Sequence, residues 1–354
     1  MSSVSRPRPG PYLLGPRGHA ALLAGCAVAG VALVLVGVGT GAVPVPLGDV
    51  VATLARRVFG WGDGVDLATD TIVWEYRFPR TLLAFVVGAG LSLAGVLMQA
   101  LVRNPLADPY VLGVASGASA AATAAMTLGI AALAGLGIPV VAFAGAAATM
   151  VAVLALGRRN GRIDPPRMLL AGVAVGYLMA AVTSYLQLRA TPEELANVLF
   201  WILGSLAGTS WSDLPVATAV VLLAAVLVLY RATALDLLSL GDDAASSLGV
   251  DLPRFRLELV LVAALCTGVA VAVAGGIGFV GLMIPHVARL LVGPAHRRVV
   301  PLSLLLGGCY LVLVDILCRV VRAPAELPVG IVTALVGAPF LIWLLRRDRG
   351  EVAG

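Results

Sequence analysis

The sequence predicts an all-α membrane protein with about ten transmembrane helices and both termini in the cytoplasm. Of its 354 residues, 60% are apolar and only 12% are charged, whereas a soluble domain has about 25% charged residues. The mean hydropathy is +1.01, and long apolar runs recur along the whole chain. These observations exclude a cytosolic enzyme, a secreted disulfide scaffold, a disordered protein and a nucleic-acid-binding protein.

The predicted spans are apolar runs approaching the roughly 20 residues that cross a bilayer as a helix. Together they define a single transmembrane domain over residues 1–354, whose natural partner is membrane lipid. The ten runs are residues 20–42, 81–102, 111–133, 137–157, 168–188, 214–230, 257–274, 278–292, 299–318 and 329–345.

The arginines predict which side of the membrane each connection faces. All 24 basic residues are Arg, and placing the N-terminus inside puts 17 of them in inner segments and seven in outer segments. Cytoplasmic connections carry the excess of positive charge in membrane proteins. We therefore expect cytoplasmic tails at residues 1–19 and 346–354.

Two outer segments stand out between the spans. Residues 43–80 form a long connection of mixed charge. After the fifth span, Thr191, Pro192 and Glu194 have the spacing of a capping box. We expect a helix from there to about Leu206, near the outer membrane interface.

Residues 231–256 form the long cytoplasmic connection. The pattern predicts two short helices, Ala234–Leu240 and Asp243–Leu248, with Asp242 as an N-cap and with Gly241 and Gly249 as stops. A solvated connector would need no such helices. Their apolar faces favour a docking surface for another protein.

The sequence contains no catalytic or metal-ligand grouping, and it predicts no cofactor. The chain has no Lys, so it cannot carry a P-loop. If ATP powers it, a separate subunit hydrolyses the ATP. The four cysteines lie in apolar runs without metal-ligand spacing, as small buried side chains do: Cys26, Cys266, Cys309 and Cys318.

The intramembrane candidates for a functional role are Asp315 and His286, because a charge inside a span is a functional hypothesis by default. Asp315 and Arg319 are four residues apart on one helix, so they can form an intramembrane pair. Two hypotheses remain open from the residues alone. One is a permease subunit driven by a separate ATPase through residues 231–256. The other is a proton-coupled secondary transporter that depends on Asp315 and His286.

Several segments resemble the FecCD-type permeases, which are the transmembrane subunits of binding-protein-dependent ABC importers for iron-siderophores, haem and cobalamin. The segments are RFPRTLLAFVVGAGLSLAGVLMQALVRNPLADP (77–109), LGVASGA (112–118), MLLAGVA (168–174), GGIGFVGLMIPH (275–286) and AELPVG (325–330). The resemblance extends from about residue 70 to the C-terminus.

This resemblance implies a type II ABC importer fold in the bacterial cytoplasmic membrane. It also implies a second permease subunit, identical or paralogous, two ATPase subunits and an extracytoplasmic substrate-binding protein. The family's outer arginines receive acidic residues of the binding protein, and the matching residues here are Arg77, Arg80 and Arg319. Arg322 is a further outer arginine that does not map onto the pattern.

In the family, the cytoplasmic connection carries coupling helices that rest on the ATPase. The matching residues here are Asp242, Asp243, Ala244, Ala245 and Gly249, with Asp243 in place of the usual Glu. The resemblance favours a ferric siderophore as substrate and leaves cobalamin and haem as alternatives.

Overall fold

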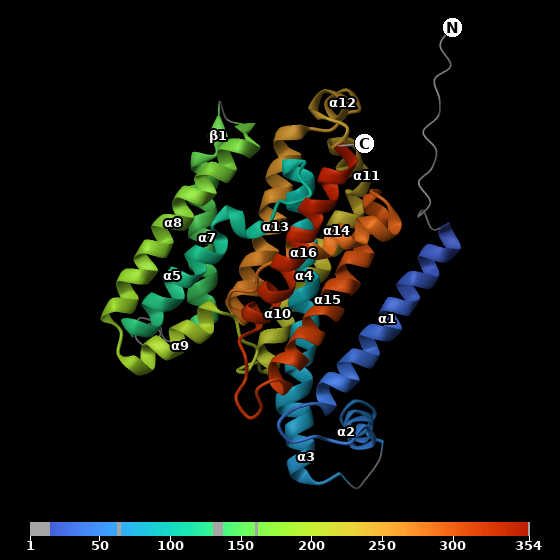
Figure 1. The fold of residues 1–354 in the computed structure, drawn as a ribbon, viewed down its shortest axis with the longest axis vertical. Helices are drawn as coiled ribbons and strands as arrows, with labels where there is room; N and C mark the ends of the chain where they lie inside the picture. Colours follow the sequence, from blue (N-terminus) through green and yellow to red (C-terminus); the bar gives the residue numbers. More distant parts are fainter. Residues whose placement is uncertain (1–14, 62–64, 130–136, 160–161, 353–354) are drawn as a thin grey trace.

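The computed structural model describes residues 15–61, 65–129, 137–159 and 162–352. The described chain is a bundle of helices (Figure 1), and its only strands are the two-residue β1 (Arg158–Arg159) and β2 (Arg162–Ile163). The predicted all-α membrane class is confirmed.

Each of the ten predicted spans coincides with a helix of the described chain. Seven helical stretches are long and apolar enough to cross a bilayer, and Val280–Val292 and Val329–Leu344 are shorter apolar helices. The ten helices are α1 (Pro16–Gly39), α4 (Phe78–Val102), α5 (Val114–Thr127), α7 (Ile138–Leu156), α8 (Pro165–Arg189), α10 (Leu214–Tyr230), α13 (Leu252–Ala274), α14 (Val280–Val292), α15 (His296–Val320) and α16 (Val329–Val352).

The helix α5 differs most from its predicted span of 111–133. It has only 14 residues, and a short 3-10 helix, η2 (Pro109–Leu112), precedes it. Gly113 separates the two with a φ of 73°, a backbone conformation that glycine adopts without strain. Residues 130–133 of the prediction lie outside the described residues.

The predicted outer connection at 43–80 is largely helical, a feature that the residue pattern did not predict. It contains α2 (Leu47–Phe59), α3 (Leu67–Thr71) and the π-helix η1 (Ile72–Arg77), and the last two run directly into α4. The charged residues of this segment lower its hydropathy, but in the structure several of them are paired. Fully buried Asp70 forms ion pairs with Arg56 and Arg57 of α2.

The second outer segment has the predicted capping box but a shorter helix. The Thr191 and Glu194 side chains each accept the other residue's backbone N–H, at 3.3 and 2.9 Å. The helix α9 (Pro192–Ile202) ends before Leu206, because Gly204 adopts a φ of 80°. A short 3-10 helix, η3 (Trp211–Asp213), then leads into α10.

The cytoplasmic connection contains two short helices, α11 (Ala232–Ser239) and α12 (Asp242–Ser247). Asp242 is not the N-cap that the sequence suggested. Gly241 occupies that position with a φ of 113°, and Asp242 is the first helical residue. Its carboxylate instead accepts hydrogen bonds from Arg256 of α13 at 2.7 and 2.8 Å.

The central helix of the bundle is α4, which packs along α15, α13 and α14. Glycines allow these helices to approach closely, as in other membrane bundles. A Cβ atom on Gly88 would lie 2.2 Å from the Gly307 carbonyl oxygen, and one on Gly95 would lie 1.9 Å from that of Gly281. The contact between α4 and α15 is therefore backbone against backbone.

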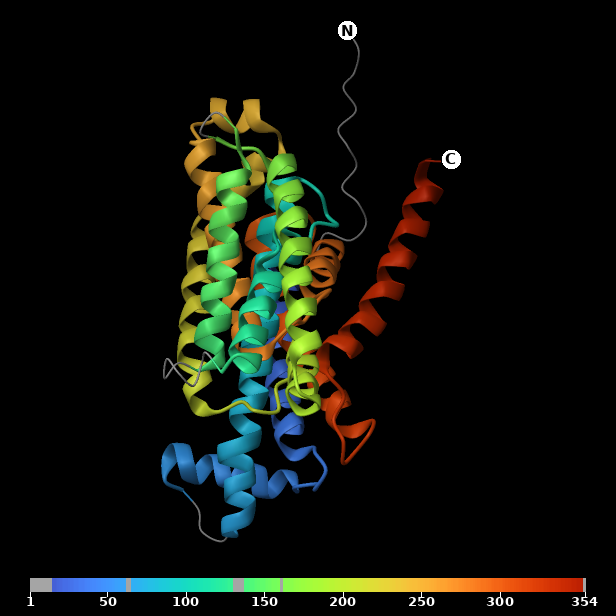
Figure 2. The same ribbon diagram turned by 90° about the vertical axis from the view of Figure 1, so that its left-hand side faces the viewer.

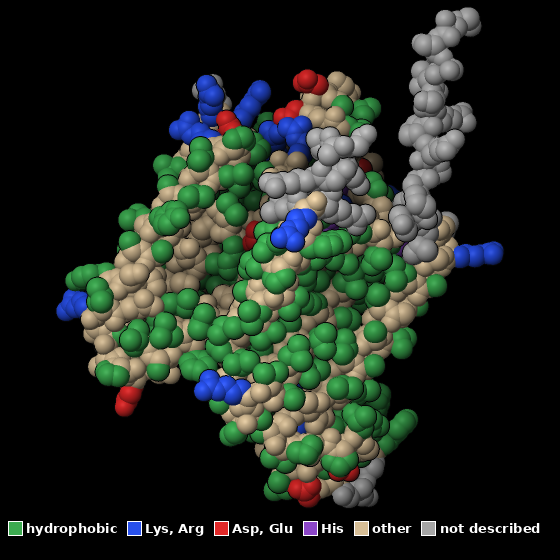
Figure 3. Space-filling model, viewed as in Figure 1, with side chains coloured by type: hydrophobic (Ala, Val, Ile, Leu, Met, Phe, Trp, Pro, Cys, Tyr) green, Lys and Arg blue, Asp and Glu red, His purple; other side chains and the backbone are tan. Residues whose placement is uncertain are grey.

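The two ends of the bundle have different contents. The helices α11 and α12, the start of α1 and the end of α16 lie towards one end, which we term the inner end (Figure 1). The helices α2, α3 and α9 lie at the opposite, outer end. An apolar band separates the charged side chains at the two ends (Figure 3), and α16 stands apart from the other helices (Figure 2). This arrangement agrees with the orientation predicted from the arginines.

The orientation predicts the outcome of reporter fusions. A fusion within residues 231–256 and one after α16 should both report the cytoplasm, because both segments lie at the arginine-rich end. A fusion beside Asp66, which precedes α3, should report the outside. A cytoplasmic signal from Asp66 would show that the bundle is inverted.

Candidate functional site

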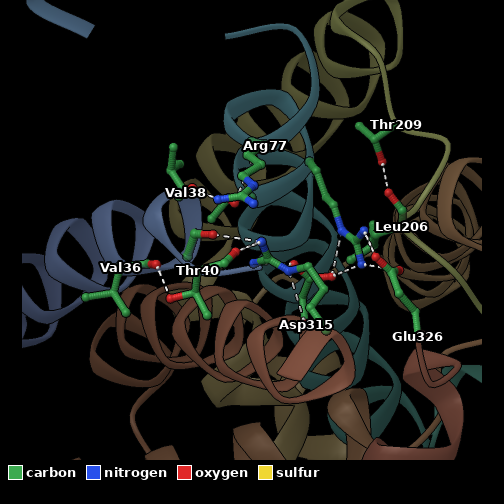
Figure 4. Close-up of polar contacts among 12 residues, drawn as sticks. Val36, Val38, Thr40, Arg77, Leu206, Thr209, Asp315 and Glu326 are labelled. Carbon is green, nitrogen blue, oxygen red and sulfur yellow. Dashed lines mark hydrogen bonds and ion pairs between the residues drawn. The ribbon is translucent and has the colours of Figure 1, made fainter. Parts of the chain in front are cut away.

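Four charged side chains meet at the outer end of the bundle. Arg80 comes from the first turn of α4, Asp315 and Arg319 from the last turns of α15, and Glu326 from the segment between α15 and α16. Figure 4 shows two of them, Asp315 and Glu326, in the same close-up as Val36, Val38 and Thr40 at the end of α1. We term these four residues the outer ionic cluster.

Asp315 is the centre of this cluster. Its Oδ1 accepts hydrogen bonds from the Nε and Nη2 atoms of Arg80 at 2.9 and 2.8 Å. Its Oδ2 lies 2.9 Å from Nη2 of Arg319. Asp315 has no exposed surface, and a buried carboxylate is tolerated only when its charge is compensated. Two guanidinium groups therefore hold this charge inside the bundle.

Arg80 also binds a second carboxylate. Its Nη1 and Nη2 atoms donate to Oε1 and Oε2 of Glu326, both at 2.9 Å. This is the bidentate geometry that arginine makes best. The Glu326 side chain is 37% exposed whereas that of Arg80 is 10% exposed. Glu326 is thus the part of the cluster that solvent or another protein can reach.

Arg319 and Arg77 both bind the end of α1. Arg319 donates from Nη1 to the carbonyl oxygens of Gly37 and Thr40, at 2.8 and 2.7 Å. Arg77 donates from Nη1 to those of Val38 and Gly39, both at 3.2 Å. The last carbonyls of a helix have no partner within it and favour a cation. The two arginines therefore fix α1 to α4 and α15.

The three arginines expected to dock a binding protein thus lie together at the outer end. Two of them, Arg80 and Arg319, are buried and paired with carboxylates of this chain. Arg77 is partly exposed and bonded to carbonyl groups. Arg322 is exposed in the segment after α15. In this conformation, a carboxylate from outside would reach Arg80 by displacing Glu326.

At the inner end, the residues expected to couple to an ATPase lie on α12 and after it. Asp242 binds Arg256 and lies 3.4 Å from Arg103, the C-cap of α4. Ala245 is buried and Asp243 is exposed. Gly249 has a φ of 88°, and a Cβ there would meet nothing within 4 Å.

The inner end also exposes two large apolar side chains beside these residues. Leu240 is 69% exposed and Leu248 is 62% exposed. An apolar patch that is rimmed by polar residues marks an interaction site, and these two leucines would contribute to such a patch. A further contact at this end joins Asp236 of α11 to His296, the first residue of α15, at 2.6 Å.

No metal centre is present among the described residues: they contain no group of three His, Cys, Asp or Glu side chains placed to hold a metal ion. His286 packs against the Phe340 ring of α16, with ring centroids 6.0 Å apart and planes at 72°. Asp315, by contrast, is surrounded by arginines.

Comparison with known protein families shows to which family the chain belongs. The model of the FecCD transport family matches residues 22–347. The chain belongs to the FecCD transport family. It is a permease subunit of an ABC importer and a multi-pass protein of the cytoplasmic membrane.

Two relatives and one solved structure support this membership. The Fe(3+) dicitrate transport system permease protein FecD of Escherichia coli is 43% identical over 78% of this chain and 86% of its own. The cobalamin import system permease protein BtuC of Halobacterium salinarum is 42% identical over 80% of this chain and 75% of its own.

The solved structure is described as an inward-facing conformation of a metal-chelate type ABC transporter. It matches 93% of this FecCD permease and 99% of its own chain, with a TM-score of 0.79 and 30% identity. The type II importer fold expected from the motifs is thereby confirmed.

Sequence reasoning missed two members of the sites in this FecCD permease. Glu326 lies within AELPVG, a segment used only for the resemblance, and its position beside Arg80 depends on a contact across 246 residues. Asp236 was one of several acidic residues in the cytoplasmic connection. Neither contact can be predicted from the periodicity of the sequence, because each joins residues that are far apart along the chain.

Replacing Asp315 with Asn should destabilise the permease strongly. The change leaves Arg319 and part of Arg80 without a counter-charge, and breaking a buried ion pair costs about 3–5 kcal/mol. The apparent melting temperature in detergent micelles measures this effect.

The matched control for that variant is Asp251→Asn, whose partner Arg254 is 3.2 Å away and 89% exposed. It should cost no more than about 1 kcal/mol. Equal melting temperatures for the two variants would show that Asp315 is not the centre of a stabilising cluster.

Proposed function

We propose that this FecCD permease translocates a ferric siderophore inward, using ATP hydrolysed by two separate ATPase subunits. A second permease subunit would complete the pathway, and an extracytoplasmic binding protein would deliver the chelate. The observation that carries the substrate class is the similarity to the dicitrate permease, whose substrate is also a ferric chelate. Cobalamin is the second candidate, because the cobalamin permease is almost equally similar.

Two properties support a separate source of energy. The chain has no Lys among its 24 basic residues, so it lacks the lysine of a P-loop. Its inner end presents Asp243, Leu240 and Leu248 to the cytoplasm on and beside two short helices. Residues 231–256 therefore serve as the coupling loop, with Asp242, Ala244, Ala245 and Gly249 shaping its surface.

Arg77, Arg80 and Arg319 serve as the docking residues for the binding protein. Exposed ion pairs contribute little affinity individually, but several together orient a partner and accelerate its encounter. Because Glu326 already occupies the accessible side of Arg80, an incoming carboxylate competes with it. Docking thus exchanges one carboxylate for another on the same guanidinium group.

Reconstituted transport tests both the energy source and the substrate. Proteoliposomes that hold this chain, its ATPase subunits and the binding protein should accumulate radiolabelled ferric siderophore only with ATP. Collapse of the proton gradient should leave uptake unchanged, since no titrating group of this chain is needed for energy coupling. Uptake of labelled cobalamin in place of iron would establish the second candidate.

The opposite result would favour the other class of transporter. If a proton gradient drives uptake without ATP, and Asp315→Asn abolishes that uptake in protein that still folds, the chain is a secondary transporter.

The exchange at Arg80 predicts opposite effects of two charge changes. Glu326→Gln should strengthen association with the binding protein several-fold, because it removes the competing charge from Arg80. Arg80→Glu should weaken association, because it places like charges together. Surface plasmon resonance at low and physiological salt measures both, and the wild-type affinity should fall as salt rises.

A control with the same charge change at the same end is Glu193→Gln, on the exposed first turn of α9. It should leave the affinity unchanged. An unchanged affinity in both Glu326→Gln and Arg80→Glu would remove Arg80 from the docking surface.

A further inference from the structure

The first turn of α15 is capped by a side chain from another helix. Its own N-cap residue, Ala295, offers no side-chain acceptor. Instead Oδ1 of Asp236, on α11, accepts the backbone N–H of His296 at 2.9 Å and lies 2.6 Å from Nδ1 of the same residue. A carboxylate at this position satisfies a free N–H group and complements the helix dipole. The start of α15 therefore depends on the position of α11.

The helix α11, which lies at the cytoplasmic surface, packs firmly against the bundle. Leu235 and Leu238 are completely buried, and α11 packs against both α15 and α4. The neighbouring α12 makes a second tie, because Asp242 binds Arg256 and lies close to Arg103 at the end of α4. Each short helix thus holds the inner end of one long helix.

These two long helices are the ones that meet in the outer ionic cluster. Along their length, α4 and α15 approach backbone to backbone at Gly88 and Gly307. At their outer ends, Arg80 of α4 binds Asp315 of α15. One continuous set of contacts therefore joins the cytoplasmic short helices to the outer cluster. Figure 1 shows α4 and α15 running between the two ends of the bundle.

We propose that Asp236 is a positioning residue that ties α11 to α15 and thereby couples the inner surface to the outer ionic cluster. A displacement of α11 by an ATPase moves the capped end of α15. Because α15 carries Asp315 and Arg319, the displacement changes the cluster at the outer end. Coupling runs equally in the other direction, since linkage between two sites is reciprocal. This inference rests on the proposed function, in which an ATPase contacts residues 231–256.

The test compares ATP hydrolysis with and without the binding protein in the complete reconstituted transporter. In Asp236→Ala, the stimulation of hydrolysis by saturating binding protein should fall about fivefold or more, the lower range of coupling between sites. Stimulation is expressed relative to each variant's own basal hydrolysis, so that a change in the basal rate is not counted as a loss of coupling. Asp236→Asn should retain most of the stimulation, because its side-chain oxygen still accepts the His296 N–H.

A matched control is Asp164→Ala at the same inner end. Asp164 caps α8 within its own helix, accepting the Arg167 N–H at 3.4 Å, and among the described residues its side chain binds no other helix. In Asp164→Ala, the stimulation of ATP hydrolysis by the binding protein should match that of wild type. Full stimulation in Asp236→Ala, or an equal loss in Asp164→Ala, would overturn the proposal.

Two further measurements separate a failure of this proposal from a failure of the proposed function or of assembly. If the wild-type complex itself shows no ATP hydrolysis that responds to the binding protein, the proposed function fails rather than the role of Asp236. If Asp236→Ala does not assemble, amide hydrogen exchange of the wild-type chain tests the proposal instead. Amide exchange in residues 296–299 should change when the ATPase subunits bind, whereas exchange in the first turn of α8 should not. Unchanged exchange in residues 296–299 would overturn the proposal.

Discussion

A single buried carboxylate, Asp315, holds the outer half of this permease together. It receives two guanidinium groups, one from its own helix and one from α4. Without it, Arg319 would keep its charge in the bundle with backbone carbonyl groups as its hydrogen-bond partners. A charge in the membrane interior is costly unless it is paired, so this interaction helps to hold α1, α4 and α15 together at their outer ends.

The same helices connect the two surfaces at which other subunits would bind. At the outer surface, Glu326 covers the accessible side of Arg80, which is where a competing carboxylate would bind in the proposed docking. At the inner surface, Asp236 caps α15 and Asp242 lies near the end of α4. Close glycine packing between α4 and α15 leaves little room for one to shift without the other. The charged contacts are therefore placed where a helix displacement would have an effect at both surfaces.

The local features were predictable from the sequence, whereas the long-range contacts were not. The apolar runs predict every one of the ten helices, and the spacing of Thr191 and Glu194 predicts the capping box that the structure contains. By contrast, the Arg80–Asp315 contact spans 235 residues. Local periodicity says nothing about which distant helices pack together. Hydropathy also failed to predict the helix before α4. Asp70 lowers the hydropathy of that segment, although in the structure Arg56 and Arg57 neutralise its charge.

The most direct test of this account is a double-mutant cycle between Arg80 and Asp315. The free energies of unfolding of Arg80→Gln, Asp315→Asn and the double variant would be measured by denaturant titration in detergent micelles. If Asp315 holds α4 to α15, the double variant should lose about 2–3 kcal/mol less than the sum of the two single losses. Losses that add within about 0.5 kcal/mol would contradict the account, because they would mean that the two side chains act independently.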